Sequence, residues 1–129
     1  MNRKMPALSL VFLLIISGCS SSSDAFTFTG ESDNWTAELK VTQTTDDNEK
    51  QHMTLQYKGE NAKNMEEFSY TVETNAGGFS AGDVVLGENG VYEDTAEANT
   101  TNTKVNKNSE VKVIVEWDNH TENMILKKE

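Results

Sequence analysis

Hydrophobic and polar residues alternate along most of the chain beyond residue 25, which is the pattern of strands with one buried face. The clearest run spans 111–117, where Val or Trp recurs at every second position. Short apolar runs at 84–86 and 124–126 predict two further strands. The residues predicted to face inward in the longer runs are Phe26 and Phe28; Trp35, Ala37, Leu39 and Val41; Met53, Leu55 and Tyr57; Phe68, Tyr70 and Val72; and Val111, Val113, Val115 and Trp117.

Turn-forming residues separate these runs. Asp, Asn and Gly cluster at 44–49, 59–64 and 75–78, and these residue types favour turns because they tolerate a bent backbone or hydrogen-bond to it. Asn89 and Gly90 predict a tight hairpin between Leu86 and Val91, and residues 118–121 predict a turn before the last strand. We therefore expect an all-β fold of seven or eight strands, an antiparallel immunoglobulin-like β-sandwich that forms a single domain over residues 25–129.

One stretch breaks the alternation. Residues 93–109 contain only three apolar side chains, those of Ala96, Ala98 and Val105. Loops of this length in a compact domain are usually functional or disordered. We predict a surface loop here and leave two interpretations open, a mobile excursion and a binding loop.

The first 19 residues have the layout of an export signal. Arg3 and Lys4 give a positive start, and the twelve residues 5–16 are almost wholly apolar. Such a segment is too short to span a hydrocarbon core of about 30 Å as a helix, but it matches the core of a signal peptide. The sequence therefore predicts export from the cytoplasm.

The end of this segment, Ile16, Ser17, Gly18 and Cys19, resembles the lipobox of bacterial lipoproteins. The resemblance implies that residues 1–18 are a cleaved signal peptide and that Cys19 becomes the lipidated first residue of the mature chain. Residues 19–24 are then the lipidated cysteine and a Ser-rich tether that reaches at most about 17 Å. The alternatives are an ordinary secretory signal and an uncleaved signal anchor.

Charge limits the partners that this chain can bind. The sequence has 21 acidic and 11 basic residues, and removal of residues 1–18 leaves nine basic residues and a net charge of about −12. Such a charge repels phosphate backbones, so we expect no nucleic-acid partner. It also repels anionic headgroups, so we expect contact with membrane lipid through the N-terminal acyl anchor. The expected location is the extracytoplasmic face of the cell membrane.

The sequence carries no recognisable catalytic motif. His52 and His120 are the only histidines, and no G-x-S-x-G motif presents a nucleophilic serine. His52 is expected to face solvent, opposite Met53, and His120 is expected in a turn. Two separated histidines do not supply the three or four ligands of a zinc site. We therefore expect no enzyme activity, no cofactor and no metal centre.

Acidic turns raise the alternative of a weak cation site. Asp46, Asp47 and Glu49 place three carboxylates in one predicted turn, and calcium prefers carboxylate oxygens as ligands. Their spacing departs from the D-x-[DN]-x-[DN]-G pattern that wraps a loop around one ion. A solvated acidic turn is the simpler interpretation.

The whole chain also resembles a group of small exported lipoproteins of Gram-positive bacteria with no assigned biochemical role. The resemblance rests on Phe28, Gly30 and Trp35 near the start of the domain, and on the strand that ends at Trp117. It implies that the two tryptophans are core anchors and that Gly30 lies in a turn. We expect a non-enzymatic binding or interaction module of the cell envelope, whose partner is an unknown envelope protein or ligand. The alternative is an accessory solute- or cation-binding lipoprotein.

Overall fold

The computed structural model describes residues 24–44, 48–60, 62–99 and 104–129. Over these residues the fold is all-β, as the alternating pattern predicts, with one short 3-10 helix, η1 (Ala62–Asn64). The strands are β1 (Asp24–Glu31), β2 (Trp35–Gln43), β3 (Asn48–Tyr57), β4 (Phe68–Thr74), β5 (Gly77–Val84), β6 (Val91–Asn99), β7 (Val111–Trp117) and β8 (His120–Lys128).

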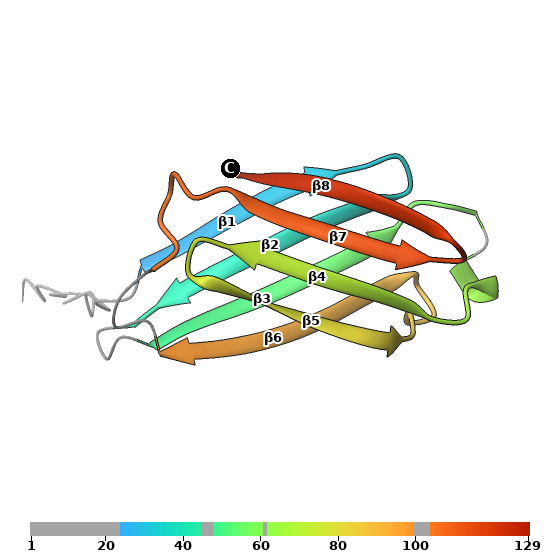
Figure 1. Cartoon of the computed structure of the whole chain (residues 1–129), viewed down its shortest axis with the longest axis horizontal. Coiled ribbons are helices and arrows are strands. Elements are labelled where there is room, and N and C mark those ends of the chain that lie inside the picture. The colour runs from blue at the N-terminus through green and yellow to red at the C-terminus, as the bar shows by residue number, and fades with distance from the viewer. Residues whose placement is uncertain (1–23, 45–47, 61, 100–103) are drawn as a thin grey trace, which may run out of the picture.

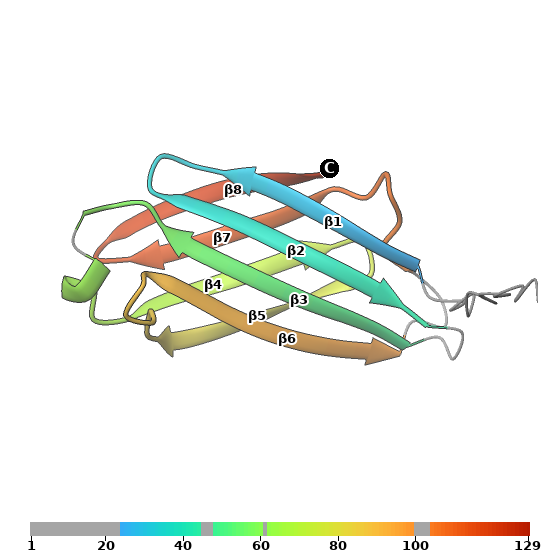
Figure 2. The same ribbon diagram turned by 180° about the vertical axis from the view of Figure 1, so that it is seen from behind.

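Each strand pairs with its neighbours in antiparallel fashion, and the eight strands form one sheet in the order β5-β4-β7-β8-β1-β2-β3-β6. The sheet folds over, so that β5, β4, β7 and β8 form the layer nearest the viewer in Figure 1. The view from behind shows β1, β2, β3 and β6 as the other layer (Figure 2). The predicted antiparallel all-β class is confirmed, and the pairing of β1 with β8 makes one sheet where the sequence predicts two.

β1 and β8 pair over a short stretch, and a glycine of β1 lies next to it. Phe28 and Thr29 pair with the last two residues of β8. One residue further along β1, a Cβ added to Gly30 would lie 2.8 Å from the carbonyl oxygen of Ile125. The expectation that Gly30 lies in a turn is wrong, because it lies within β1 and permits the close approach of β8.

The predicted elements around β5 are partly wrong. Residues 75 and 76 form the predicted turn, but Gly77 and Gly78 begin β5, and residues 85 and 86 of the predicted strand 84–86 belong to a connection. Asn89 and Gly90 do lie in a turn, in which the Gly90 N–H donates to the Gly87 carbonyl at 2.9 Å. The strands on either side, β5 and β6, are opposite edges of the sheet and form no hairpin.

The predicted surface loop 93–109 is shorter than expected. Residues 93–99 belong to β6, which pairs with β3 along its whole length. β6 is an edge strand whose exposed face carries Glu93, Thr95 and Glu97. Because these residues are polar, the sequence of β6 does not show the apolar pattern that predicts a strand. In the described part of the remaining loop, Val105 is 1% exposed and belongs to the core.

Trp35 lies at the centre of the aromatic core. It is fully buried, and its ring centroid lies 5.2 Å from that of Tyr57, 5.1 Å from that of Phe68 and 5.6 Å from that of Trp117. These partners come from β3, β4 and β7, so that one side chain packs against both layers. Trp117 is also buried, and the predicted burial of both tryptophans is confirmed.

Side chains of β4 and of the edge strand β6 bridge the two layers on the side away from the β1–β8 pairing. Tyr70 on β4 donates a hydrogen bond to the carboxylate of Asp94 on β6, and the ring of Tyr92 lies 5.5 Å from those of Phe68 and Tyr70. Burial is the largest cause that raises the pKa of Tyr70, and the hydrogen bond and charge of Asp94 raise it further. Its hydroxyl therefore stays protonated and donates at neutral pH.

Replacing Trp35 with Ala is expected to lower the free energy of unfolding by about 3–5 kcal/mol, because it leaves a cavity among three other rings. Urea denaturation followed by circular dichroism measures this difference. Ile125→Ala is the control, since Ile125 is 43% exposed and its truncation should cost under about 1 kcal/mol. Equal small losses for both variants would contradict the central position of Trp35.

Candidate functional site

Glu49, the member of the predicted cation cluster that the structure describes, is buried within the fold. Its side chain is 1% exposed. Its carboxylate accepts hydrogen bonds from Gln43 Nε2 at 2.9 Å, Gln51 Nε2 at 2.5 Å and the Val105 N–H at 3.2 Å. Protein donors therefore occupy both oxygens, and Glu49 faces the interior instead of a solvated turn.

The other predicted site residues lie outside the described residues. They are Ile16, Ser17, Gly18, Cys19, Asp46 and Asp47.

Hydrogen bonds from the Glu49 cluster and the β4–β5 turn hold residues 104–110 in place. Gln43 donates to the carbonyl of Val105. On the other side, Asn75 Nδ2 donates to the carbonyl of Lys104 at 2.9 Å, and Asn75 Oδ1 accepts from Ser109 Oγ at 2.7 Å. The buried cluster thus has a structural role, which is to fasten this segment over one end of the interior.

The two histidines lie apart on the surface. His52 faces outward on β3, with Nδ1 2.7 Å from Thr95 Oγ1 and Nε2 3.6 Å from Glu93 Oε1. His120 is exposed at the start of β8, and its ring centroid lies 5.2 Å from that of Trp117. The predicted outward position of His52 is confirmed. In the described part of the chain, neither ring hydrogen-bonds to a serine, so neither forms the hydrogen bonds of a catalytic triad.

The two ends of the folded sheet differ in charge. We define the far end as residues 31–35, 57–60, 62–68, 83–91 and 116–122, the connections on the right of Figure 1. It contains two lysines, Lys58 and Lys63, and ten acidic residues. The acidic residues are Glu31, Asp33, Glu60, Glu66, Glu67, Asp83, Glu88, Glu116, Asp118 and Glu122.

The opposite part of the sheet is nearly balanced. We define the near half as residues 24–28, 40–44, 48–52, 72–79, 95–99, 104–113 and 127–129, and β1 begins there. It contains six acidic residues and seven lysines, the latter being Lys40, Lys50, Lys104, Lys107, Lys112, Lys127 and Lys128. The acidic residues of the far end come from four separate connections and the strand ends beside them, so the asymmetry appears only once the chain is folded.

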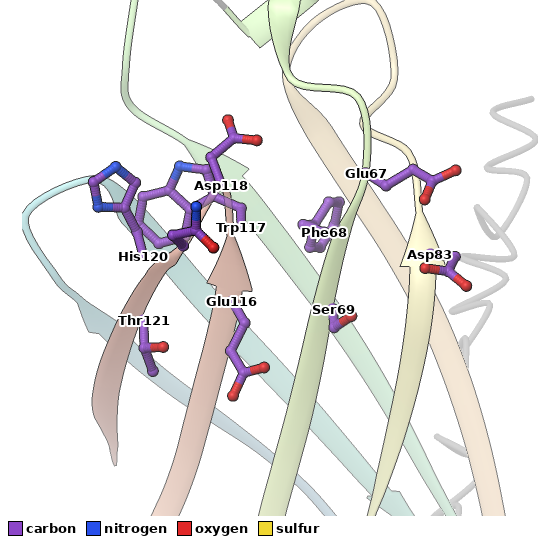
Figure 3. Close-up of a pocket in the computed structure, with 10 residues that line it drawn as sticks. Glu67, Phe68, Ser69, Asp83, Glu116, Trp117, Asp118, His120 and Thr121 are labelled. Carbon is purple, nitrogen blue, oxygen red and sulfur yellow. The ribbon is translucent and has the colours of Figure 1, made fainter.

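A shallow depression of about 460 Å³ lies at the far end between β4, β5, β7 and β8. Phe68, Trp117 and His120 line it together with four carboxylates, those of Glu67, Asp83, Glu116 and Asp118. Figure 3 shows these carboxylates pointing in different directions, with Asp118 and Glu116 turned away from each other. General acid and base pairs need carboxyl groups that converge on one bond, so this arrangement presents charge to solvent.

Glu122 ties the β1–β2 turn of the far end to β8. Its Oε1 accepts from Ser32 Oγ at 2.5 Å and from the Asn34 N–H at 2.9 Å, and its Oε2 accepts from Asn34 Nδ2 at 2.6 Å. Partial burial acts to raise the pKa of Glu122, but the hydrogen bonds from Ser32 and Asn34 outweigh it and lower the pKa below its ordinary value. The carboxylate is therefore charged at neutral pH and holds the turn in place.

Neither a metal centre nor a membrane-spanning helix is found in the described ranges. Residues 24–44, 48–60, 62–99 and 104–129 include no group of three His, Cys, Asp or Glu side chains arranged to hold a metal ion. No helix in the same ranges is long and apolar enough to cross a membrane.

Replacing Glu122 with Gln is expected to lower the free energy of unfolding by about 1–3 kcal/mol at pH 7, because the amide has one acceptor oxygen instead of two and carries no charge. A lowered pKa in the folded state stabilises the protein above the ordinary pKa of 4.5, and this stabilisation is lost as the pH falls through the folded-state value. Urea denaturation at pH 7 and near pH 3 should therefore show the gap between wild type and variant shrinking in acid. Glu116→Gln, at an exposed position, is the control. If the difference in unfolding free energy between wild type and Glu122→Gln does not change with pH, the Glu122 charge does not have this role.

Comparisons with protein-family models, curated proteins and solved structures find no match to this chain. The residues and their geometry are therefore the basis of the function proposed below.

Proposed function

We propose that this protein is a lipid-anchored, extracytoplasmic binding module whose far end contacts a basic partner in the cell envelope. The observation that carries the proposal is the charge asymmetry of the folded sheet. The far end has ten acidic residues and two lysines, whereas β1 begins in the near half, where lysines and acidic residues are almost equal in number.

This asymmetry orients an anchored domain. The predicted lipid on Cys19 lies five residues before the start of β1, so the near half stays close to the bilayer. Anionic headgroups repel the acidic far end more strongly than the near half, where lysines and acidic residues are almost equal in number. A strand of eight to ten residues spans roughly 30 Å, and the far end consequently projects away from the membrane toward other envelope components.

The proposed module acts by binding and is not an enzyme. Support comes from the separated histidines and from the divergent carboxylates at the far end. The cation-binding alternative loses one of its three carboxylates, because Glu49 is engaged by protein donors. The immunoglobulin-like sandwich stays a prediction about the fold, since all eight strands belong to one sheet.

Replacing Cys19 with Ala is expected to abolish lipidation and to release the protein from the membrane fraction or leave it unprocessed. The physical reason is that the alanine has no thiol to accept the lipid. Fractionation with mass spectrometry of the N-terminus measures both effects, and Ser20→Ala is the matched control. Wild-type processing and fractionation of Cys19→Ala would contradict the anchor.

Neutralising four acidic residues of the far end is expected to weaken binding of a hexalysine peptide several-fold at low salt. The variant combines Glu67→Gln, Asp83→Asn, Glu116→Gln and Asp118→Asn. Its control combines Glu73→Gln, Glu97→Gln, Glu110→Gln and Glu129→Gln, which changes the net charge equally but elsewhere. Fluorescence anisotropy of the labelled peptide measures affinity, and the difference should fade as salt screens the charges. Equal weakening by both variants would show that binding depends on net charge and not on the far end.

A further inference from the structure

A second depression at the far end is apolar at its base. It has a volume of about 430 Å³ and is lined by Ala62, Met65, Val85, Leu86, Gly87 and Glu88. Met65 and Leu86 are 7% and 9% exposed and form part of the core, whereas Val85 is 59% exposed. Val85 is thus a large aliphatic side chain left open to solvent beside a depression, in a position where a partner can cover it.

The walls of this groove are held by backbone hydrogen bonds. The Met65 N–H, just after η1, donates to the Ala62 carbonyl at 3.3 Å, and the Gly87 N–H donates to the Val91 carbonyl at 2.9 Å. The two segments lie side by side in Figures 1 and 2. A groove with fixed walls binds a side chain without first having to order its own backbone.

Charge around the groove selects its occupant. Glu88 lines the groove, and Glu60 and Glu88 both line the adjoining depression of about 370 Å³. A second copy of this chain would bring two far ends together, each with ten acidic residues, and like charges repel at such an interface. Anionic lipid is disfavoured for the same reason. A basic polypeptide brings the opposite charge.

We propose that this groove is the docking site for an aliphatic side chain flanked by Lys or Arg on a partner polypeptide. The inference rests on the proposed function and adds to it the chemistry of the contact. The aliphatic side chain covers Val85 and fills the groove over Met65 and Leu86, while the flanking cations face the carboxylates of the far end. Burial of the aliphatic group supplies affinity and the charges supply orientation and association rate.

The test compares two labelled peptides, Lys-Lys-Leu-Lys-Lys and Lys-Lys-Ser-Lys-Lys, binding to the full chain in nonionic detergent, with detergent alone as the blank. The leucine peptide is expected to bind roughly tenfold more tightly to the wild type, because its side chain leaves water in the groove. Val85→Ser should remove this preference and leave the affinity for the serine peptide unchanged. Ile125→Ser is the matched control, since Ile125 is the other exposed large hydrophobic residue among those described and lies on β8 outside the groove. It should keep the tenfold preference.

The outcomes separate this inference from the proposed function. If both peptides bind equally to the wild type, or if Val85→Ser keeps the leucine preference, the groove is not the docking site although the far end still binds basic chains. If neither peptide binds, the proposed function fails together with the inference. Light scattering on the same samples tests whether a second copy of this chain occupies the groove. A dimer that Val85→Ser dissociates would assign the groove to a second copy and overturn the proposal.

Discussion

The packing of Trp35 between the two layers is the interaction on which the rest of the structure depends. Among the described residues, backbone hydrogen bonds join the layers where β1 meets β8, over two residue pairs and from the Glu129 N–H to the Thr27 carbonyl. β5 and β6 are the two edges of the sheet. The layers are therefore held face to face mainly by the side chains between them. Trp35 contacts rings from both layers at once, and this packing offsets the cost of burying its Nε1, which has no hydrogen-bond partner among the described residues.

Two carboxylates, buried Glu49 and partly buried Glu122, hold connections at opposite ends of the sheet. Glu49 accepts hydrogen bonds from two glutamines and a backbone N–H in the near half, and Glu122 accepts three hydrogen bonds at the far end. Each carboxylate fastens a connection that strand pairing does not hold, the 104–110 segment in one case and the β1–β2 turn in the other. The loops at the far end consequently have defined positions, and the charges and the groove there have a defined geometry.

The sequence predicts the strands that alternate regularly and fails where a strand lies at an edge. Period-two alternation predicts the inward residues of β2, β3, β4 and β7, because the opposite layer covers one face of each of these strands. β5 is rich in glycine and β6 in acidic residues, since each is an edge strand with little of its surface buried. The far-end site is hidden from sequence reasoning for a different reason: its acidic residues and its groove come from connections that only folding brings together. The exposed Val85, next to buried Leu86, lies within a short apolar run that the sequence predicts as a strand.

The proposed orientation of the domain on a membrane links the fold to the proposed function. If the near half faces the bilayer, the acidic far end is free to meet a basic partner; if the domain lies flat, lipid headgroups compete for that surface. The proposed anchor next to β1, the acidic charge of the far end and the length of the strands all favour the upright arrangement.

Energy transfer between the lipidated protein and the membrane tests this central claim most directly. A donor dye is placed at Asn89→Cys in the far end or at Asn108→Cys in the near half, both exposed positions, and acceptor lipids are included in the vesicles. The account predicts strong transfer from position 108 and much weaker transfer from position 89, because the two ends are roughly 30 Å apart. Equal transfer from the two positions would mean that the domain lies flat, and it would contradict the account.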